Sequence, residues 1–179
     1  EMNRLGILVD LSHVGAKTSD DAIRHSKKPV AYTHCLPSAL KEHQRNKSDE
    51  QLKFIAERGG FIGVTMFPLF LRRGNDSTVD DYVEAMDHVI NLVGEDCIGF
   101  GTDFTQDQDQ AFFDSLYHDK GDGRELIAVG ELIDPLGMRT HGEYPNLTEA
   151  MLKSGWSEAK VRKIMGENWL RVLKEVWGA

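Results

Sequence analysis

The chain has 179 residues, of which 40% are hydrophobic and 28% are charged, and its formal net charge is −8. This length allows one domain with a sizeable core. The negative charge and the scattered Lys and Arg residues argue against a nucleic-acid surface, which needs clustered basic side chains. No run approaches the roughly 20 apolar residues that a membrane-spanning helix requires.

Only two cysteines are present, Cys35 and Cys97. They are too few for a disulfide framework and fit a reducing compartment, so we expect a cytoplasmic protein, with the periplasm as the alternative. The first residues, Glu1 to Leu5, have the pattern of a helix end, and Gly6 then opens an apolar run. We therefore expect further residues upstream of Glu1.

Short apolar runs alternate with segments of helical periodicity along the chain. We interpret four apolar runs as buried strands, and they cover residues 6–13, 29–34, 61–67 and 97–104. Helix signals, including capping boxes and apolar stripes, predict helices at about 18–26, 48–58, 77–93, 147–154 and 157–177. Between the last strand and the closing helices, the polar segment 105–145 is long enough to predict a functional loop or insertion.

Four strand–helix repeats predict an α/β fold in which a parallel sheet is covered by helices, either doubly wound or a barrel. No Gly-rich phosphate loop follows a strand, because Gly99 and Gly101 lie within the fourth run, so a nucleotide site is disfavoured. Cys97, Gly99, Gly101 and Asp103 share one face of that run. Small residues on one face suit a crowded barrel interior. We expect one domain over residues 1–179.

Three polar residues end three of the four predicted strands: His13, His34 and Asp103. In parallel α/β folds, reactive side chains gather at the carboxyl ends of strands. Imidazole suits zinc, and a carboxylate either ligates the metal or takes a proton from its water. A single strand-end histidine is more often a hydrogen-bonded polar residue than a ligand. Three such residues together favour a metal site.

Six motifs, in order along the chain, carry a family resemblance: Leu5–His13, Lys27–His34, Gln44–Leu52, Ile98–Phe104, Tyr144–Leu147 and Gly166–Val172. They resemble the zinc-dependent membrane (renal) dipeptidases, and the match covers nearly the whole chain. The resemblance implies a TIM (β/α)8 barrel, of which this chain would be the C-terminal half, strands five to eight with their helices. It also implies two zinc ions bridged by a carboxylate and a water.

The resemblance assigns roles to individual residues. His13 and His34 would ligate the second zinc, and Asp103 would lie beside the first zinc and accept a proton from the nucleophilic water. Arg45 would bind the terminal carboxylate of the substrate, for which a planar fork of donors is suited. The alternative for Arg45 is a surface loop arginine. Phe67 stands where the family has a substrate-contacting tyrosine.

Three features depart from the family pattern. The His-x-Asp pair of the first barrel strand and the bridging glutamate of the third have no counterpart here, so the chain carries half of a dinuclear site. Phe67 lacks the hydroxyl of the family's tyrosine. The segment 35–37 after His34 and the excursion 105–145 also differ. These departures indicate a different pocket, and D-configured or N-acylated amino acids are the alternative substrates to L-dipeptides.

The expected function is a zinc-dependent dipeptidase that hydrolyses dipeptides through a metal-bridging water. The alternatives are another metal-dependent amidohydrolase, of the N-acyl-D-amino-acid deacylase or lactonase type, and a non-catalytic half-barrel fragment. The expected ligands are two Zn2+ ions in the complete site and a dipeptide or N-acyl amino acid. A half-barrel exposes sheet edges and an apolar face, so we expect a homodimer, aggregation, or pairing with a missing N-terminal half.

Overall fold

The computed structural model describes residues 1–104, 110–116 and 131–178. The strands are β1 (Ala31–Cys35), β2 (Phe61–Val64) and β3 (Ile98–Phe100). The helices before β3 are α1 (Met2–Leu5), α2 (Ala16–His25), α3 (Asp49–Glu57), η1 (Gly74–Asp76) and α4 (Val79–Val93). Those after β3 are α5 (Gln110–Leu116), η2 (His141–Glu143), α6 (Tyr144–Lys153), α7 (Glu158–Arg162), η3 (Lys163–Glu167) and α8 (Asn168–Trp177).

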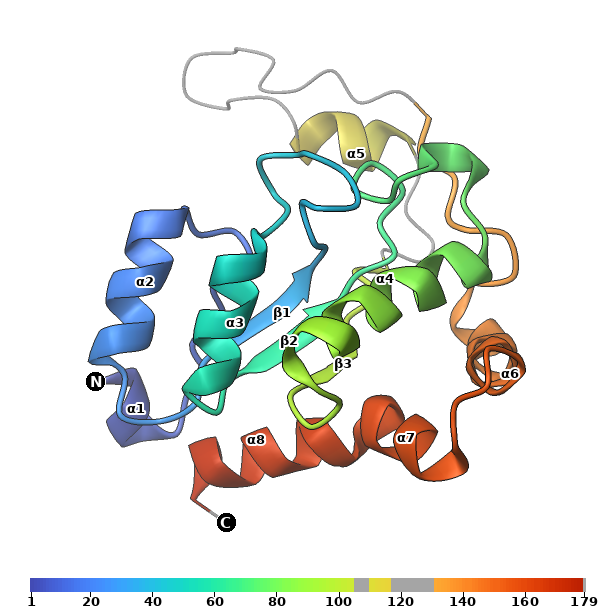
Figure 1. The fold of residues 1–179 in the computed structure, drawn as a ribbon. Helices are drawn as coiled ribbons and strands as arrows, with labels where there is room; N and C mark the ends of the chain where they lie inside the picture. The colour runs from blue at the N-terminus through green and yellow to red at the C-terminus, as the bar shows by residue number, and fades with distance from the viewer. Residues whose placement is uncertain (105–109, 117–130, 179) are drawn as a thin grey trace.

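The three strands form one parallel sheet in the order β1-β2-β3. Ala31 pairs with Phe61, and Ile62 pairs with Ile98. Helices α2, α3 and α4 follow one another side by side, and α3 and α4 lie in front of this sheet (Figure 1). The predicted α/β class with a parallel sheet and covering helices is therefore confirmed. The described sheet has three strands where four were predicted, because the segment before β1 does not form a regular strand.

Residues 6–13, predicted as the first strand, lie beside β1 but make only one bridge to it, from Asp10 to Ala31. The backbone N–H of Leu11 donates to Ala31 O at 2.8 Å. The ladder stops there because the N–H of Thr33 donates to the Asp10 side chain, at 3.1 Å from Oδ1, instead of to a backbone carbonyl. The strand prediction was wrong, because its polar residue replaces the backbone pairing with a side-chain contact.

Helix α4 shows why these residues form a helix at this place. Thr78 and Asp81 make a reciprocal capping box at its start, and Gly94 ends it with φ 83°. Between them, Val83 and Met86 of the predicted apolar stripe are buried against the sheet. The buried Tyr82 hydroxyl donates to the carbonyl of Val64 in β2 at 2.6 Å, which ties the helix to the middle strand.

The predicted helix 157–177 is interrupted. A π-helical turn, η3, separates α7 from α8, and Gly166 within it has φ 172° and ψ −28°. The break lets the Asn168 side chain reach the sheet: its Nδ2 donates to the carbonyls of Glu95 and Ile98, both at 2.7 Å. A contact between segments about 70 residues apart in the sequence thus overrides the continuous helical periodicity.

Beyond this break, α8 packs on the beginning of the sheet. Val172 and Val176 form a second apolar cluster with Ala31 and Phe61, which begin β1 and β2. The Trp169 ring lies on the Phe61 ring, with 3.8 Å between the centroids. The closing helix therefore holds the amino ends of the strands and leaves their carboxyl ends for the loops.

Gly101, one of the small residues predicted to face the sheet interior, and Gly63 of β2 are both required by close backbone approach. A Cβ atom on Gly63 would lie 2.0 Å from the Thr33 carbonyl oxygen, and one on Gly101 would lie 1.8 Å from the same atom. No real side chain tolerates such contacts. The three strands therefore converge on Thr33, directly before the predicted site residue His34.

Candidate metal and active site

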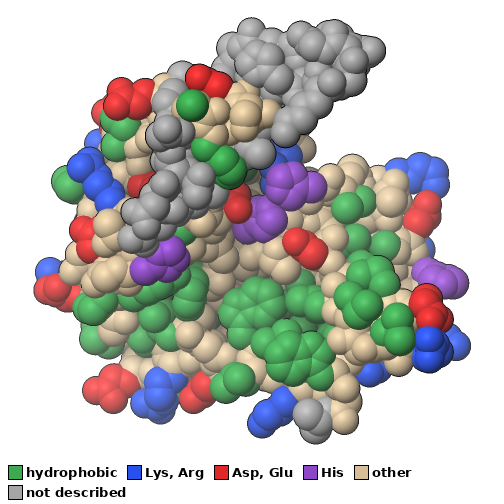
Figure 2. Space-filling view, turned by 180° about the vertical axis from the view of Figure 1, so that it is seen from behind, with side chains coloured by type: hydrophobic (Ala, Val, Ile, Leu, Met, Phe, Trp, Pro, Cys, Tyr) green, Lys and Arg blue, Asp and Glu red, His purple; other side chains and the backbone are tan. Residues whose placement is uncertain are grey.

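The three residues predicted from the strand ends lie together. His13 Nε2 is 2.9 Å from His34 Nε2, and His34 Nε2 is 4.0 Å from Asp103 Oδ2. They come from segments far apart in the sequence, and the parallel sheet brings these segments to one edge. Figure 2 shows histidine side chains beside acidic ones near the middle of the rear face, with a hydrophobic patch below them.

The local backbone conformation of each of the three residues determines where its side chain lies. His34 lies in β1, and His13 lies in the turn that follows Leu11. Asp103 has φ 60° and is the only non-glycine residue with positive φ in the described part of the chain. Non-glycine residues rarely adopt this conformation, and Asp tolerates it better than most. The strained backbone turns the Asp103 carboxylate toward the histidines.

A hydrogen-bond network lies behind His34. The Asp10 carboxylate accepts from the N–H and hydroxyl of Ser12 and from the N–H and hydroxyl of Thr33. Burial alone would raise the pKa of Asp10, but these hydrogen bonds outweigh it and hold the pKa below its ordinary value. The Thr33 hydroxyl also contacts His34 Nδ1 at 2.8 Å.

The electrostatics of the site favour neutral imidazole. Burial lowers the pKa of His13 most, and the nearby Arg45 guanidinium and His34 ring lower it further, against smaller opposing effects of the Asp103 and Asp10 carboxylates. A histidine that ligates a metal must be neutral, because the lone pair on the ring nitrogen makes the bond. The surroundings of His13 therefore suit a ligand.

The side chains present fit part of a metal site. Two nitrogen ligands on one tetrahedral zinc are about 3.4 Å apart, from zinc–nitrogen bonds of roughly 2.0–2.1 Å. The two Nε2 atoms face one another at 2.9 Å, a few tenths of an ångström short of that spacing. Within the described residues, no group of three or more His, Cys, Asp or Glu could hold an ion by itself. The pair thus supplies two ligands of an incomplete set.

Arg45 and Phe67, which were predicted to bind substrate, both lie near the ring of Phe70, a residue that the sequence did not single out. The Arg45 guanidinium lies 5.2 Å from the centroid of the Phe70 ring, and the Phe67 ring lies 5.1 Å from it. His43 stacks on the same ring at 4.7 Å. Phe70 therefore joins the loop after β1 to the loop after β2.

Buried Lys47 fixes the loop that carries Arg45. Its Nζ donates to the carbonyl of Val14 at 3.0 Å and lies 4.8 Å from the centroid of the Tyr32 ring. Burial lowers the pKa of Lys47. Because Val14 follows His13 directly, one ammonium group links the Arg45 loop to the segment that presents His13.

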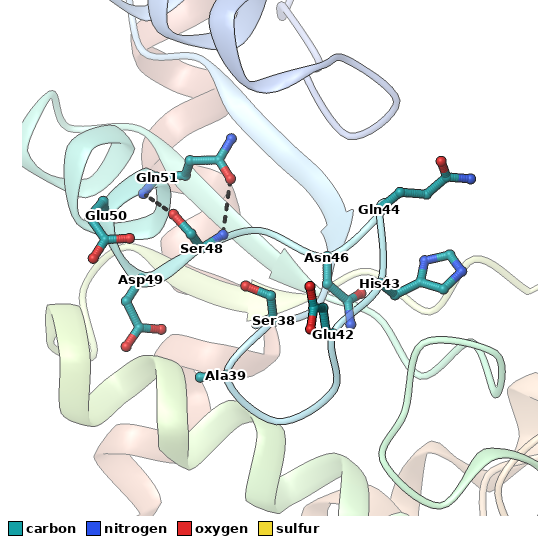
Figure 3. A pocket seen from close by; sticks show the side chains of 10 residues that line it. All are labelled: Ser38, Ala39, Glu42, His43, Gln44, Asn46, Ser48, Asp49, Glu50 and Gln51. Atoms are coloured by element: carbon teal, nitrogen blue, oxygen red, sulfur yellow. Dashed lines mark hydrogen bonds between the residues drawn. The ribbon is translucent and has the colours of Figure 1, made fainter.

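A separate hollow of about 650 Å³ lies beside the start of α3 and is lined by Ser38, Ala39, Glu42, His43, Gln44, Asn46, Ser48, Asp49, Glu50 and Gln51. Figure 3 shows Asp49 and Glu50 on one side of it and His43 and Gln44 extending away on the other. Ser48 and Gln51 hold each other in the capping box. His13, His34 and Asp103 do not line this hollow, so the three candidate ligands lie outside it.

The residues that sequence reasoning missed are Asp10, Thr33 and Phe70. Asp10 carries a visible signal, since a carboxylate in the middle of an apolar run needs a partner. Thr33, next to a strand-end histidine, carries a weaker one. Phe70 carries none, because its contacts depend on how two loops fold over each other.

No helix in the described part of the chain combines the length and the apolar character needed to cross a membrane.

The chain matches the model of the membrane dipeptidase family, peptidase family M19, over residues 1–128 and 123–178. It is 35% identical over 177 residues to dipeptidase tcpJ of Claviceps purpurea. The aligned region covers 98% of this chain and 36% of that protein. The chain therefore spans about a third of the length of this curated relative.

Solved structures of similar proteins match nearly the whole chain. An amidohydrolase from Pseudomonas aeruginosa is 64% identical with a TM-score of 0.96, over 99% of this chain and 55% of that one. A metallopeptidase from Rhodobacter sphaeroides, solved with a phosphinate mimic of the dipeptide L-Ala-D-Ala, is 31% identical with a TM-score of 0.78, over 98% of this chain and 44% of that one. The chain belongs to the membrane dipeptidase family, peptidase family M19.

Proposed function

We propose that this chain is the C-terminal half of a TIM-barrel metallodipeptidase, with β1, β2 and β3 among the barrel's last strands. Family membership and the parallel sheet support this, and so does the coverage of the two solved relatives, since this chain matches 44–55% of their length. Residues 6–13 would complete their pairing when a further strand covers them on the other side. The single domain and the inserted loop at 105–145 stay predictions, and much of that loop lies outside the described residues.

The observation that carries the proposal is the meeting of His13, His34 and Asp103 at one edge of the sheet. His13 and His34 would hold a divalent metal, with zinc favoured by the imidazole donors. When bound, such a metal makes water a better nucleophile and polarises the substrate carbonyl. In the proposed two-zinc site, the other ligands come from outside this chain.

The chain's own residues would bind substrate and move the proton. Asp103 takes a proton from the attacking water and passes it to the leaving amine. Arg45 binds the substrate's terminal carboxylate, and its ring contact with Phe70 limits the directions in which the guanidinium points. Phe67, whose ring lies 5.1 Å from that of Phe70, would contact substrate through its ring alone.

Dipeptides are the proposed substrates. The Rhodobacter sphaeroides relative was solved with a mimic of L-Ala-D-Ala, so a D-configured second residue belongs in any substrate panel. The Pseudomonas aeruginosa relative is called an amidohydrolase, and N-acyl amino acids therefore remain the second candidate class. A panel of L-L, L-D and N-acyl compounds, assayed with zinc and with a chelator, tests the function. Absence of metal-dependent cleavage of every dipeptide would refute it.

The proposed half-barrel needs a partner. Leu5, Ile7 and Trp177 are 46–62% exposed, and a Cβ on Gly6 would lie 3.4 Å from the Trp177 backbone. The two chain segments that carry these apolar side chains thus lie close together, where α8 packs at the amino ends of the strands. We propose that the N-terminal half of the barrel, or a second copy of the chain, covers the open face.

Arg45→Lys is expected to raise KM for dipeptides about tenfold or more with a smaller change in kcat, because a planar two-point contact is lost. Dipeptide amides, which lack the carboxylate, should show no such difference between the variant and the parent. Arg72→Lys is the matched control, since Arg72, in the loop after β2, pairs with Glu84 of helix α4. Equal effects of Arg45→Lys on dipeptides and their amides would contradict the role.

A further inference from the structure

We infer that Asp10 is a positioning residue that sets the tautomer of His34 through the hydroxyl of Thr33. In this arrangement the His34 proton lies on Nδ1 and its lone pair lies on Nε2, facing His13. The inference rests on the proposed role of His34 as a metal ligand. It concerns the metal-free protein as well, so it has a test of its own.

The direction of the hydrogen bonds begins at Asp10. An ionised carboxylate has no proton to give and only accepts. Its Oδ2 lies 2.7 Å from Thr33 Oγ1, so the Thr33 hydroxyl must donate. Its Oδ1 accepts from the Ser12 hydroxyl at 2.6 Å, from the Ser12 N–H at 3.0 Å and from the Thr33 N–H at 3.1 Å. These contacts hold the carboxylate in one orientation.

The second step is at Thr33. A hydroxyl group has one proton and two lone pairs. Since the proton of Thr33 is given to Asp10, Oγ1 can only accept from His34 Nδ1, which lies 2.8 Å away. His34 Nδ1 must then carry the ring proton. Ser12 supports the same residue from the backbone, because its Oγ accepts the His34 N–H at 3.0 Å.

The third step is at Nε2 of His34. In a neutral imidazole with a proton on Nδ1, Nε2 carries the lone pair. His13 Nε2, at 2.9 Å, then donates its proton to it in the metal-free protein. The same lone pair is the one a metal would use. Asp10 therefore acts on the proposed ligand through two hydrogen bonds in series, as outer partners of metal ligands do.

Two substitutions break this series at different points. In Asp10→Asn, the amide oxygen stays with the backbone N–H groups of Ser12 and Thr33, so the amide nitrogen takes the place of Oδ2 and donates to Thr33. The Thr33 hydroxyl then donates to Nδ1, and the His34 proton moves to Nε2. Thr33→Val removes the hydroxyl at nearly constant volume. Thr33→Ser keeps the hydroxyl and is the rescue control.

The test uses the full chain without metal, with ¹⁵N-labelled histidine, and reads the protonated ring nitrogen of His34 from its ¹⁵N chemical shifts. We expect Nδ1–H in the parent and in Thr33→Ser, Nε2–H in Asp10→Asn, and a mixture in Thr33→Val. Zinc affinity, measured by competition with a chromogenic chelator, should fall about 10–100-fold in Asp10→Asn and Thr33→Val and stay near the parent value in Thr33→Ser.

An Nε2–H tautomer in the parent chain would overturn the inference, as would an unchanged tautomer in both Asp10→Asn and Thr33→Val. If Asp10→Asn does not fold, the Thr33→Val and Thr33→Ser pair decides the matter. The proposed metal site has a separate test. If the parent chain shows the expected tautomer but a variant without the His34 imidazole binds zinc as tightly as the parent, the metal site is contradicted and the tautomer inference is not. The two failures are therefore distinguishable.

Discussion

Asp103→Asn is expected to lower kcat for dipeptide hydrolysis by about a thousandfold in the active enzyme, because a positioned general base contributes roughly 10²–10⁴ to the rate. The amide cannot take the proton of the attacking water. Asparagine tolerates the left-handed φ of 60° found at this position, so the backbone should be retained. Metal content should be unchanged, since His13 and His34 remain.

The measurement is kcat and KM together with the metal content of the purified variant. Asp96→Asn is the matched control, because Asp96 pairs with Lys163 and takes no part in the site. Turnover within a few-fold of the parent would show that Asp103 is not the base. Loss of metal in proportion to loss of turnover would show that Asp103 is chiefly a ligand.

Gly101→Ala is expected to destabilise the fold by more than about 3 kcal/mol or to prevent folding, which exceeds the usual range for overpacking. The new methyl group would lie 1.8 Å from the Thr33 carbonyl oxygen and 3.0 Å from its carbon. The backbone has little freedom to withdraw, because the Gly101 N–H donates to Val64 O at 2.9 Å. Denaturant unfolding gives the free energy directly.

Gly15→Ala is the control for this substitution. Gly15 has φ −65°, and a Cβ there would meet nothing within 4 Å. Gly15 is the N-cap of α2, where alanine is less favourable than glycine, and alanine also restricts the unfolded state, so the replacement should change the free energy of unfolding by no more than about 1 kcal/mol. Similar unfolding free energies for the two variants would mean that the strands do not approach Thr33 as closely as described.

Much of the fold follows from local sequence. The capping box and apolar stripe of α4 predict its position within two residues at the start and its end at Val93. The apolar runs at β1, β2 and β3 predict a parallel sheet. Strand-end positions predict that His13, His34 and Asp103 converge, since parallel strands share one carboxyl edge.

Features that depend on contacts between distant segments were not predictable. The apolar run at 6–13 has the composition of a strand, yet the Asp10 side chain takes a backbone donor and ends the pairing. The closing helix has continuous periodicity, yet Asn168 breaks it by reaching the carbonyls of Glu95 and Ile98. Neither contact is visible in a window of local sequence.

The most direct test of the account is a crystal structure of the active enzyme with bound zinc, with the metal located by its anomalous scattering. We predict a zinc ion about 2.0–2.1 Å from Nε2 of both His13 and His34, with the Asp103 carboxylate beside the site. Zinc bound elsewhere, with the two histidines still sharing the hydrogen bond seen here, would contradict it.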